Sequence, residues 1–236
     1  MSKTAKNSKK EQWKPTIDIK PATARQETYW FELGLKLDED SQIILATGAA
    51  GTGKTFLACA KAAELYIEGH VSEILITRPM VEAGQGKEVM GALPGEMDEK
   101  FDPWIANVKF MLGEIMTHGK VKNAWGKTIR AEPLAYCRGK TFDNAFIIGD
   151  EFQNADWEQT KMLCTRVGKW SKLVLAGDTS QCDLPRRVTS GLDKLTYEVK
   201  RQHMPIEIIK FLPADNQRSG ISRIMTECFD NAEPTE

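Results

Sequence analysis

The sequence has little cysteine or histidine from which to build a metal centre or a disulfide framework. Its five cysteines are far apart, their number is odd, and no two have the Cys-x-x-Cys spacing. The three histidines are equally scattered. Structural zinc sites take closely spaced cysteine and histidine ligands, and disulfide-rich secreted domains usually carry an even set of cysteines. The sequence therefore argues against both and favours a reducing, cytoplasmic location.

Long hydrophobic runs and an excess of one charge are also missing. No stretch approaches the roughly 18 consecutive apolar residues that a membrane-spanning helix needs. Residues 1–14 are basic but lack the apolar core of a signal peptide. Lysine and arginine together number 32 against 33 aspartates and glutamates, a net charge of −1, so no overall charge attracts nucleic acid or an acidic membrane. We therefore expect no membrane association.

The chain has 236 residues, 41% of them hydrophobic, which suits one domain with one core. No internal repeat or low-complexity linker divides its middle. We expect a single domain over residues 21–230, a disordered basic tail over residues 1–20 and a short disordered tail over residues 231–236. The basic tail has two interpretations, a solubilising segment or an arm that binds nucleic acid.

Five short, largely apolar runs predict strands, and the first of them fits a strand buried on both faces of a parallel sheet. They cover residues 43–47, 73–77, 145–149, 172–176 and 206–211. Helices are expected over residues 56–67, 103–116, 156–167, with Asp156 as N-cap, and 219–229. The rest of residues 80–127 resembles an irregular insertion. Strands that alternate with helices predict an α/β, three-layer fold with a mainly parallel central sheet, in which ligands bind at the carboxyl ends of the strands.

One segment between a predicted strand and a predicted helix has the chemistry of a phosphate-binding loop. Residues 48–55, GAAGTGKT, match the pattern G-x-x-x-x-G-K-[ST] without exception. Such a P-loop wraps phosphates in backbone N–H groups, its lysine supplies a positive charge, and its threonine ligates Mg²⁺. Two further GKT triplets, at residues 126–128 and 139–141, lack the first glycine. The predicted ligands are ATP and Mg²⁺, held by Gly48, Ala49, Ala50, Gly51, Thr52, Gly53, Lys54, Thr55 and Phe56.

Two further strand ends carry polar residues suited to ATP hydrolysis. The strand over residues 145–149 ends in Asp150 and Glu151, the form of a Walker B motif. Asp150 is expected to hold Mg²⁺ together with Thr55, and Glu151 to polarise the attacking water; the alternative is an exposed loop start. Gln181, five residues beyond the strand over residues 172–176 in Gly-Asp-x-x-Gln, is a candidate for contacting the γ-phosphate or the lytic water. Without the P-loop, this last pattern would be ordinary turn chemistry.

Together these motifs resemble the PhoH family, the phosphate-starvation-inducible P-loop ATPases related to one lobe of superfamily 1 helicases. The resemblance spans about residues 25–229 and includes Thr77-Arg78-Pro79, Leu93-Pro94-Gly95, the run from Pro133 to Thr141, Asp150-Glu-Phe-Gln-Asn154, and the run from Gly177 to Pro185. It implies a Mg²⁺-dependent ATPase with a RecA/helicase-like core that associates with RNA or single-stranded DNA. It also implies a homo-oligomeric ring, most simply a hexamer.

The resemblance assigns roles to two more residues. Gln26, ahead of the first predicted strand, matches the position that reads adenine in helicase-like folds, although an ordinary surface glutamine is the alternative. Arg218, just before the last predicted helix, resembles the arginine that reaches the γ-phosphate, or else forms an ion pair at the helix start. Candidates for an arginine that acts on a neighbouring subunit's ATP are Arg166, Arg186 and Arg187.

The sequence departs from the family pattern in two places within this span. Residues 84–93 are longer than usual, so the loop after Arg78 is expected to differ. Gly149 replaces the usual aliphatic residue before Asp150, which is expected to loosen the packing of that strand. A PIN nuclease domain of longer relatives has no counterpart here, so no nuclease activity is implied. Two other functions stay open: an ATP-switched assembly module without helicase activity, and a P-loop kinase.

Overall fold

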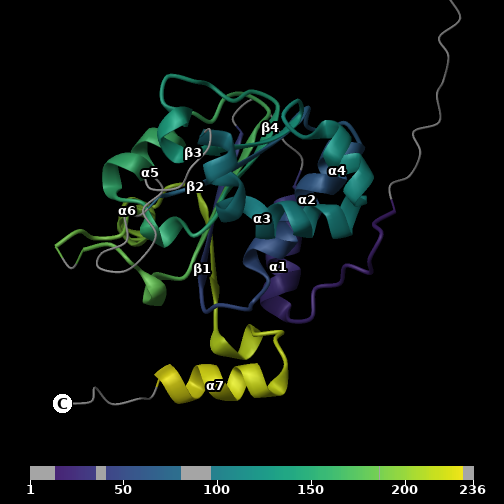
Figure 1. Cartoon of the computed structure of the whole chain (residues 1–236). Coiled ribbons are helices and arrows are strands. Elements are labelled where there is room, and N and C mark those ends of the chain that lie inside the picture. Colours follow the sequence, from purple (N-terminus) through teal and green to yellow (C-terminus); the bar gives the residue numbers. More distant parts are fainter. Residues whose placement is uncertain (1–13, 36–40, 81–96, 186, 231–236) are drawn as a thin grey trace, which may run out of the picture.

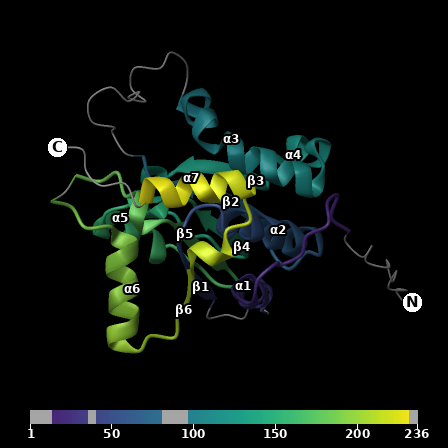
Figure 2. The same cartoon turned by 90° about the horizontal axis from the view of Figure 1, so that it is seen from below.

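A central sheet with helices on both faces forms the body of the molecule (Figure 1). The computed structural model describes residues 14–35, 41–80, 97–185 and 187–230. Seen from below, α5 and α6 lie on one side of the strands, and α2, α3 and α4 lie on the other (Figure 2). This is the three-layer α/β arrangement that the alternating strands and helices predict, so the predicted fold class is confirmed.

Six strands form the sheet in the order β3-β2-β4-β5-β1-β6, and every neighbouring pair is parallel. The strands are β1 (Gln42–Gly48), β2 (Glu73–Arg78), β3 (Ile129–Pro133), β4 (Ala145–Gly149), β5 (Lys172–Gly177) and β6 (Glu207–Phe211). All residues of β4 and β5 are buried, as befits central strands covered on both faces. Because all the strands run the same way, their carboxyl ends meet at one edge of the sheet.

Side chains of alternate strand residues pack into two separate hydrophobic cores, one on each face of the sheet. Phe146 and Ile148 of β4 face the core beneath α1–α4, whereas Ile147 faces the core beneath α5 and α6. The α-helices are α1 (Ala24–Gly34), α2 (Lys54–Ile67), α3 (Met97–Met116), α4 (His118–Ala124), α5 (Trp157–Cys164), α6 (Gly191–Gln202) and α7 (Gly220–Asp230). Short 3₁₀ turns are η2 (Leu134–Cys137), η3 (Phe152–Asn154), η4 (Thr179–Gln181) and η5 (Pro213–Asp215). No helix in the described part of the chain is long and apolar enough to cross a membrane.

All five predicted strands are present, as are the four predicted helices. Asp156 caps α5 as expected: its carboxylate accepts the Gln159 N–H, and the Gln159 side chain accepts the Asp156 N–H in return. Four elements were not predicted from the sequence: α1, α4, α6 and β3. The part expected to be an irregular insertion therefore contains α4 and leads into an edge strand. The expected long loop over residues 84–93 lies outside the described residues.

Part of the segment expected to belong to the disordered tail packs on the domain. The Thr16 backbone N–H and hydroxyl both donate to the Ile115 carbonyl at 3.0 and 3.1 Å, and Ile17 and Ile19 contact the core beneath α1–α4. The remainder of both expected tails, residues 1–13 and 231–236, lies outside the described residues.

Gly149 does not loosen β4 in the way expected. It pairs in regular register with Thr77 of β2 and Leu175 of β5. A Cβ added at Gly149 would meet the Phe152 ring at 2.8 Å and a Leu175 methyl at 2.9 Å. The space that an aliphatic side chain would take is thus filled by these two buried side chains, and the packing is tight.

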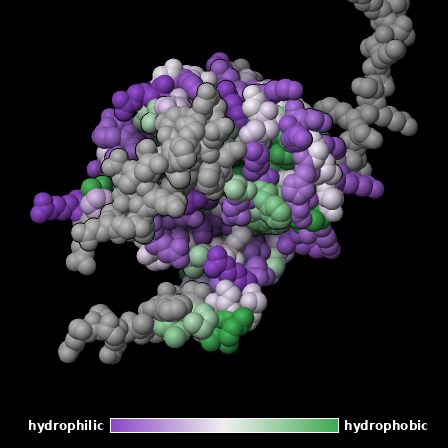
Figure 3. Space-filling model, viewed as in Figure 1, coloured by the Kyte–Doolittle hydropathy of each residue, from purple (hydrophilic) through white to green (hydrophobic). Residues whose placement is uncertain are grey.

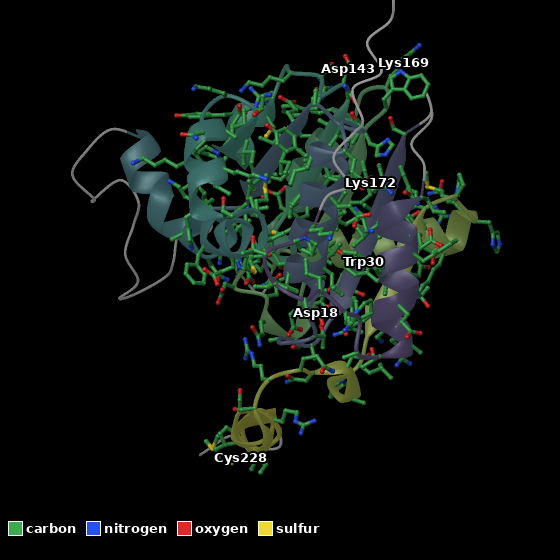
Figure 4. All side chains as sticks on the ribbon, turned by 90° about the vertical axis from the view of Figure 1, so that its right-hand side faces the viewer. Asp18, Trp30, Asp143, Lys169, Lys172 and Cys228 are labelled. Carbon is green, nitrogen blue, oxygen red and sulfur yellow. The ribbon has the colours of Figure 1, made fainter. Side chains whose placement is uncertain are left out.

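The last helix stands apart from the body of the molecule. In Figures 1 and 4, α7 lies below the domain, with Cys228 pointing away from it. Three of its apolar side chains, Ile221, Ile224 and Met225, are 66%, 60% and 42% exposed. Figure 3 shows apolar residues on this helix. Their spacing by three and four positions places them on one helical face.

A buried lysine joins the sheet to α1. Lys172, the first residue of β5, is fully buried, and its ammonium donates to the carbonyls of Glu32, Leu33 and Leu35 at 2.9, 2.7 and 3.2 Å. These carbonyls lie at the end of α1, and that of Glu32 also accepts the Leu35 N–H at 3.3 Å. Figure 4 shows Lys172 within the body of the domain. Burial lowers the pKa of Lys172 to about 7, because the charged form loses its hydration.

We expect this lysine to make stability depend on pH. Between about pH 7 and pH 10.5 the unfolded chain keeps the proton that the folded chain loses, so stability rises with pH there, by at most about 1.4 kcal/mol per pH unit. Lys172→Met keeps the aliphatic stem and removes the titration. Urea unfolding at pH 7, 8 and 9 measures the free energy of unfolding of both proteins. As the pH rises, the free energy of unfolding of the parent should increase relative to that of Lys172→Met. An unchanged difference contradicts the prediction.

Candidate functional site

The P-loop connects β1 to α2 at the carboxyl edge of the sheet. Three of its glycines have positive φ, at 121° for Gly48, 75° for Gly51 and 82° for Gly53. A side chain at Gly48 would run into the main chain of Phe211 on the neighbouring strand β6. The loop therefore depends on glycine both for its dihedral angles and for close approach to the next strand. The N-terminus of α2 adds free N–H groups and the positive end of the helix dipole.

The ammonium of Lys54 lies within the curve of this loop. It donates to the Gly48 and Ala49 carbonyls, each at 2.7 Å, and lies 3.4 Å from the Thr52 hydroxyl. Burial lowers the pKa of Lys54, while the nearby carboxylates of Asp178, Glu151 and Asp150 oppose that shift. A concentrated positive charge inside a ring of glycines fits a phosphate group.

The end of β4 brings a carboxylate to the same place. The Thr55 hydroxyl donates to Asp150 Oδ1 at 2.6 Å. Burial raises the pKa of Asp150, and the hydrogen bond from Thr55 partly offsets this rise. Hydroxyl and carboxylate oxygens are ligands that Mg²⁺ accepts. The residues predicted to hold the metal ion, Thr55 and Asp150, are thus in contact and fit that role.

Glu151 follows at a bend of the main chain. Its φ and ψ are 50° and 38°, a left-handed conformation that is uncommon for a residue with a side chain and is found at functional sites. Glu151 lines the same cleft as the P-loop, and so do Gln181 and Arg218. We call this space the phosphate cleft; its volume is about 680 Å³, including the part open to solvent. The structure thus brings together all four predicted catalytic residues, Lys54, Glu151, Gln181 and Arg218.

A second pocket adjoins the phosphate cleft and shares Gly51, Gly53, Phe56 and Arg218 with it. Its volume is about 690 Å³, again including the part open to solvent, and Gln26 and Gln217 complete its polar lining with Lys20. We call it the outer pocket. A pocket that continues from a phosphate site is where the base and sugar of a nucleotide would lie.

Gln26 is buried, so its interpretation as an ordinary surface residue is wrong. Its amide accepts from the Ala22 N–H at 2.6 Å and donates to the Thr52 carbonyl at 3.0 Å. Gln26 therefore ties the segment before α1 to the P-loop. One amide hydrogen and one lone pair stay available to a ligand.

Arg218 lies over the P-loop from the segment between η5 and α7. The Gln217 N–H donates to the Gly51 carbonyl at 3.0 Å, and Asn216 Oδ1 accepts the Arg218 N–H at 2.8 Å. A Cβ at Gly51 would collide with both Asn216 and Arg218. Among the described residues Arg218 forms no ion pair, which removes the alternative of a charge pair at the helix start.

Of the three arginines proposed to act on a neighbouring subunit's ATP, neither of the two that the structure describes lines the phosphate cleft. Arg166 lies at the end of α5, where its side chain reaches the Thr165 hydroxyl at 3.3 Å. Arg187 is exposed in the loop between η4 and α6. Arg186 lies outside the described residues.

The phosphate cleft also contains residues without a predicted role. Asp178 follows β5, while Asn107 and Met111 come from α3. Asp178 belongs to the Gly-Asp-x-x-Gln motif, so the sequence held a signal for it. Nothing in the sequence marks Asn107 or Met111, because only the packing of α3 across the P-loop brings them to the cleft.

Comparison with known proteins agrees with these motifs. Residues 18–230 match the family model for PhoH-like proteins. The chain is 39% identical over 208 residues to Protein PhoH of Escherichia coli strain K12, covering 86% of this chain and 57% of that protein. It is 42% identical over 191 residues to the PhoH-like protein of Bacillus subtilis strain 168, covering 80% of this chain and 59% of that one. The PhoH-like protein of Synechocystis is 34% identical over 218 residues, 92% of this chain and 64% of the relative. The chain thus spans about three fifths of the length of these relatives.

Proposed function

Because the chain belongs to the PhoH-like protein family, we propose that it binds ATP with Mg²⁺ and hydrolyses it. One observation carries the proposal: the P-loop ammonium of Lys54 and the carboxylate of Glu151 line a single cleft. The ammonium would bind the terminal phosphates, and the carboxylate would accept a proton from water. Mg²⁺, held by Thr55 and Asp150, would neutralise charge on the phosphates.

The remaining residues would orient the substrate. Gln181 is exposed on η4 at the rim of the phosphate cleft, where its amide can reach the γ-phosphate or the attacking water. Arg218 is also exposed and offers a second cation to the phosphates. In the outer pocket, Gln26 would contact the base. The direct test is release of phosphate from ATP by the purified protein with and without Mg²⁺. No release above background contradicts the proposal.

A kinase is the less favoured alternative. A kinase must exclude water and position an acceptor, whereas we propose that Glu151 and Gln181 serve water activation. An ATP-switched assembly module would also hydrolyse ATP, but hydrolysis would control assembly and would not be coupled to nucleic acid. ATPase rates with single-stranded RNA, with single-stranded DNA and without nucleic acid distinguish the coupled enzyme, which nucleic acid stimulates, from the switch, which it does not.

We propose coupling to single-stranded nucleic acid, supported by one aromatic-basic pair at the carboxyl edge of the sheet. Tyr136 is 48% exposed on η2, directly after β3, and Arg138, two residues further along the chain, is exposed as well. Exposed aromatic rings stack on bases, and arginine contacts phosphates or rings. We propose that these two exposed side chains contact single-stranded nucleic acid, which supports the coupling.

Tyr136→Ala should therefore weaken binding of single-stranded RNA by about tenfold, the effect of losing one stacking contact of roughly 1–3 kcal/mol. Fluorescence anisotropy with labelled RNA and DNA oligonucleotides measures it. Tyr197→Ala, which removes an exposed tyrosine from α6, is the matched control and should leave affinity unchanged. Equal affinities for parent and Tyr136→Ala contradict the proposed contact.

We further propose that the working unit is a ring of identical subunits, most simply a hexamer. The chain has one P-loop and one acidic pair at its cleft, and Gln181 and Arg218 there are exposed, so a neighbour can cover the nucleotide. Head-to-tail packing of identical subunits closes into a ring. The exposed apolar face of α7, adjacent to Arg218 in the chain, offers a surface for that contact.

Light scattering should give a mass near six subunits when ATP and Mg²⁺ are present. Mixing Lys54→Ala chains with Arg187→Ala chains should restore part of the activity if Arg187 acts on the neighbour's ATP, because some junctions then combine two intact halves. A monomer with full ATPase activity at every concentration rules the ring out.

A further inference from the structure

A buried glutamine outside the predicted site joins two parts of it. Gln153, on η3, is 1% exposed and comes two residues after Glu151. Its amide nitrogen donates to Glu151 Oε2 at 2.6 Å and to the Gln181 carbonyl at 3.3 Å. Its amide oxygen accepts the Asp178 N–H at 3.1 Å. Both amide hydrogens are thus used, and the oxygen is paired with a backbone donor, which defines how the amide is oriented.

These partners lie at the ends of two neighbouring strands. Glu151 follows β4, whereas Asp178 and Gln181 follow β5. A Cβ at Gly177 would meet the main chain and the amide of Gln153, each at 2.8 Å, so β5 ends directly against this glutamine. Buried polar groups with every bond satisfied are rigid, and leaving any of them unpaired is costly. The carboxylate of Glu151 is therefore held to the segment that carries Gln181.

We propose that Gln153 is a positioning residue for ATP hydrolysis, an inference that rests on the function proposed above. Its amide holds one oxygen of the Glu151 carboxylate and leaves the other free to face the phosphate cleft. The same amide holds η4, so a shift of Gln181 on contact with the γ-phosphate moves the support of Glu151 as well. Gln153 thereby couples the residue that senses the terminal phosphate to the residue that activates water. Neighbouring Asn154 differs, since its side chain accepts the Asp183 N–H at 2.8 Å and bonds to neither Glu151 nor Gln181.

The test is a substitution that keeps the volume of Gln153 and removes its amide. Gln153→Met should lower kcat by at least tenfold, while the dissociation constant for ATP changes by less than threefold, because the P-loop is untouched. In a Glu151→Gln background, adding Gln153→Met should lower the residual rate by less than threefold, since no carboxylate is left to position. If Gln153 had only a structural role, the double variant would lose rate by the product of the factors for Glu151→Gln and Gln153→Met alone. Asn154→Leu, which removes an anchor of the same loop, is the matched control and should keep kcat within threefold of the parent.

The outcomes separate this inference from the proposed function. If the parent hydrolyses ATP and Gln153→Met does so at the parent rate, the positioning role alone is refuted. It is also refuted if Gln153→Met and Asn154→Leu lose kcat equally. If the parent hydrolyses no ATP, both the proposed function and the positioning role of Gln153 are refuted. Should Gln153→Met not fold, Gln153→Glu, which keeps the acceptor for Asp178, is judged by the same criteria; failure of both to fold would assign Gln153 to stability alone.

Discussion

Lys54→Ala should abolish ATP binding, with the dissociation constant raised by a factor of 100 or more. The ammonium of Lys54 is the positive charge that the glycines enclose, and within the loop it donates to the Gly48 and Ala49 carbonyls. Its loss leaves the terminal phosphates without their partner in a partly buried site, where charge interactions are strong. Titration with a fluorescent ATP analogue, with Mg²⁺ present, measures the change.

The chain offers a matched control for this prediction. Lys127 is exposed and belongs to one of the two GKT triplets that lack the first glycine. Lys127→Ala should leave ATP affinity unchanged. If both substitutions weaken binding equally, or if neither does, the P-loop assignment is wrong.

Glu151→Gln should preserve ATP binding and lower kcat by at least a hundredfold. An amide has nearly the same shape as the carboxylate but cannot accept a proton from water, and positioned general bases contribute roughly 10²- to 10⁴-fold. The P-loop and the contact between Thr55 and Asp150 stay intact, so the nucleotide should still bind. Single-turnover hydrolysis and ATP titration of the same preparation separate the two effects.

Glu158→Gln, at an exposed position in the first turn of α5, is the control and should hydrolyse ATP at the parent rate. Hydrolysis at the parent rate by Glu151→Gln would show that another group accepts the proton. Asp178, which also lines the phosphate cleft, would then be the next candidate.

The two substitutions are expected to affect the proposed ring differently. A chain that binds ATP but does not hydrolyse it should hold the nucleotide-bound assembly for longer. Glu151→Gln is therefore the form in which light scattering should most readily detect six subunits, whereas Lys54→Ala should not assemble in response to ATP. Assembly of both variants to the same extent would separate oligomerisation from nucleotide binding.

Local patterns in the amino-acid sequence are enough to identify the P-loop, the acidic pair and five of the strands. Each is a local pattern: eight residues of fixed spacing for the loop, and short, largely apolar runs for the strands. The N-cap at Asp156 is local for the same reason, since its partner Gln159 lies three residues away. Such features need no knowledge of what packs against them.

Which distant residues line the site depends on how the helices and strands pack. Gln26 is buried against the P-loop, and Asn107 reaches the phosphate cleft, because whole helices pack there. The expectation that Gly149 loosens β4 was wrong, because Phe152 in the following turn and Leu175 on the neighbouring strand pack tightly against it. Gln153 received no role from its motif because its partners at Asp178 and Gln181 come together with Glu151 only when β4 and β5 pair. Contacts between residues far apart in the chain depend on packing, which a local pattern does not encode.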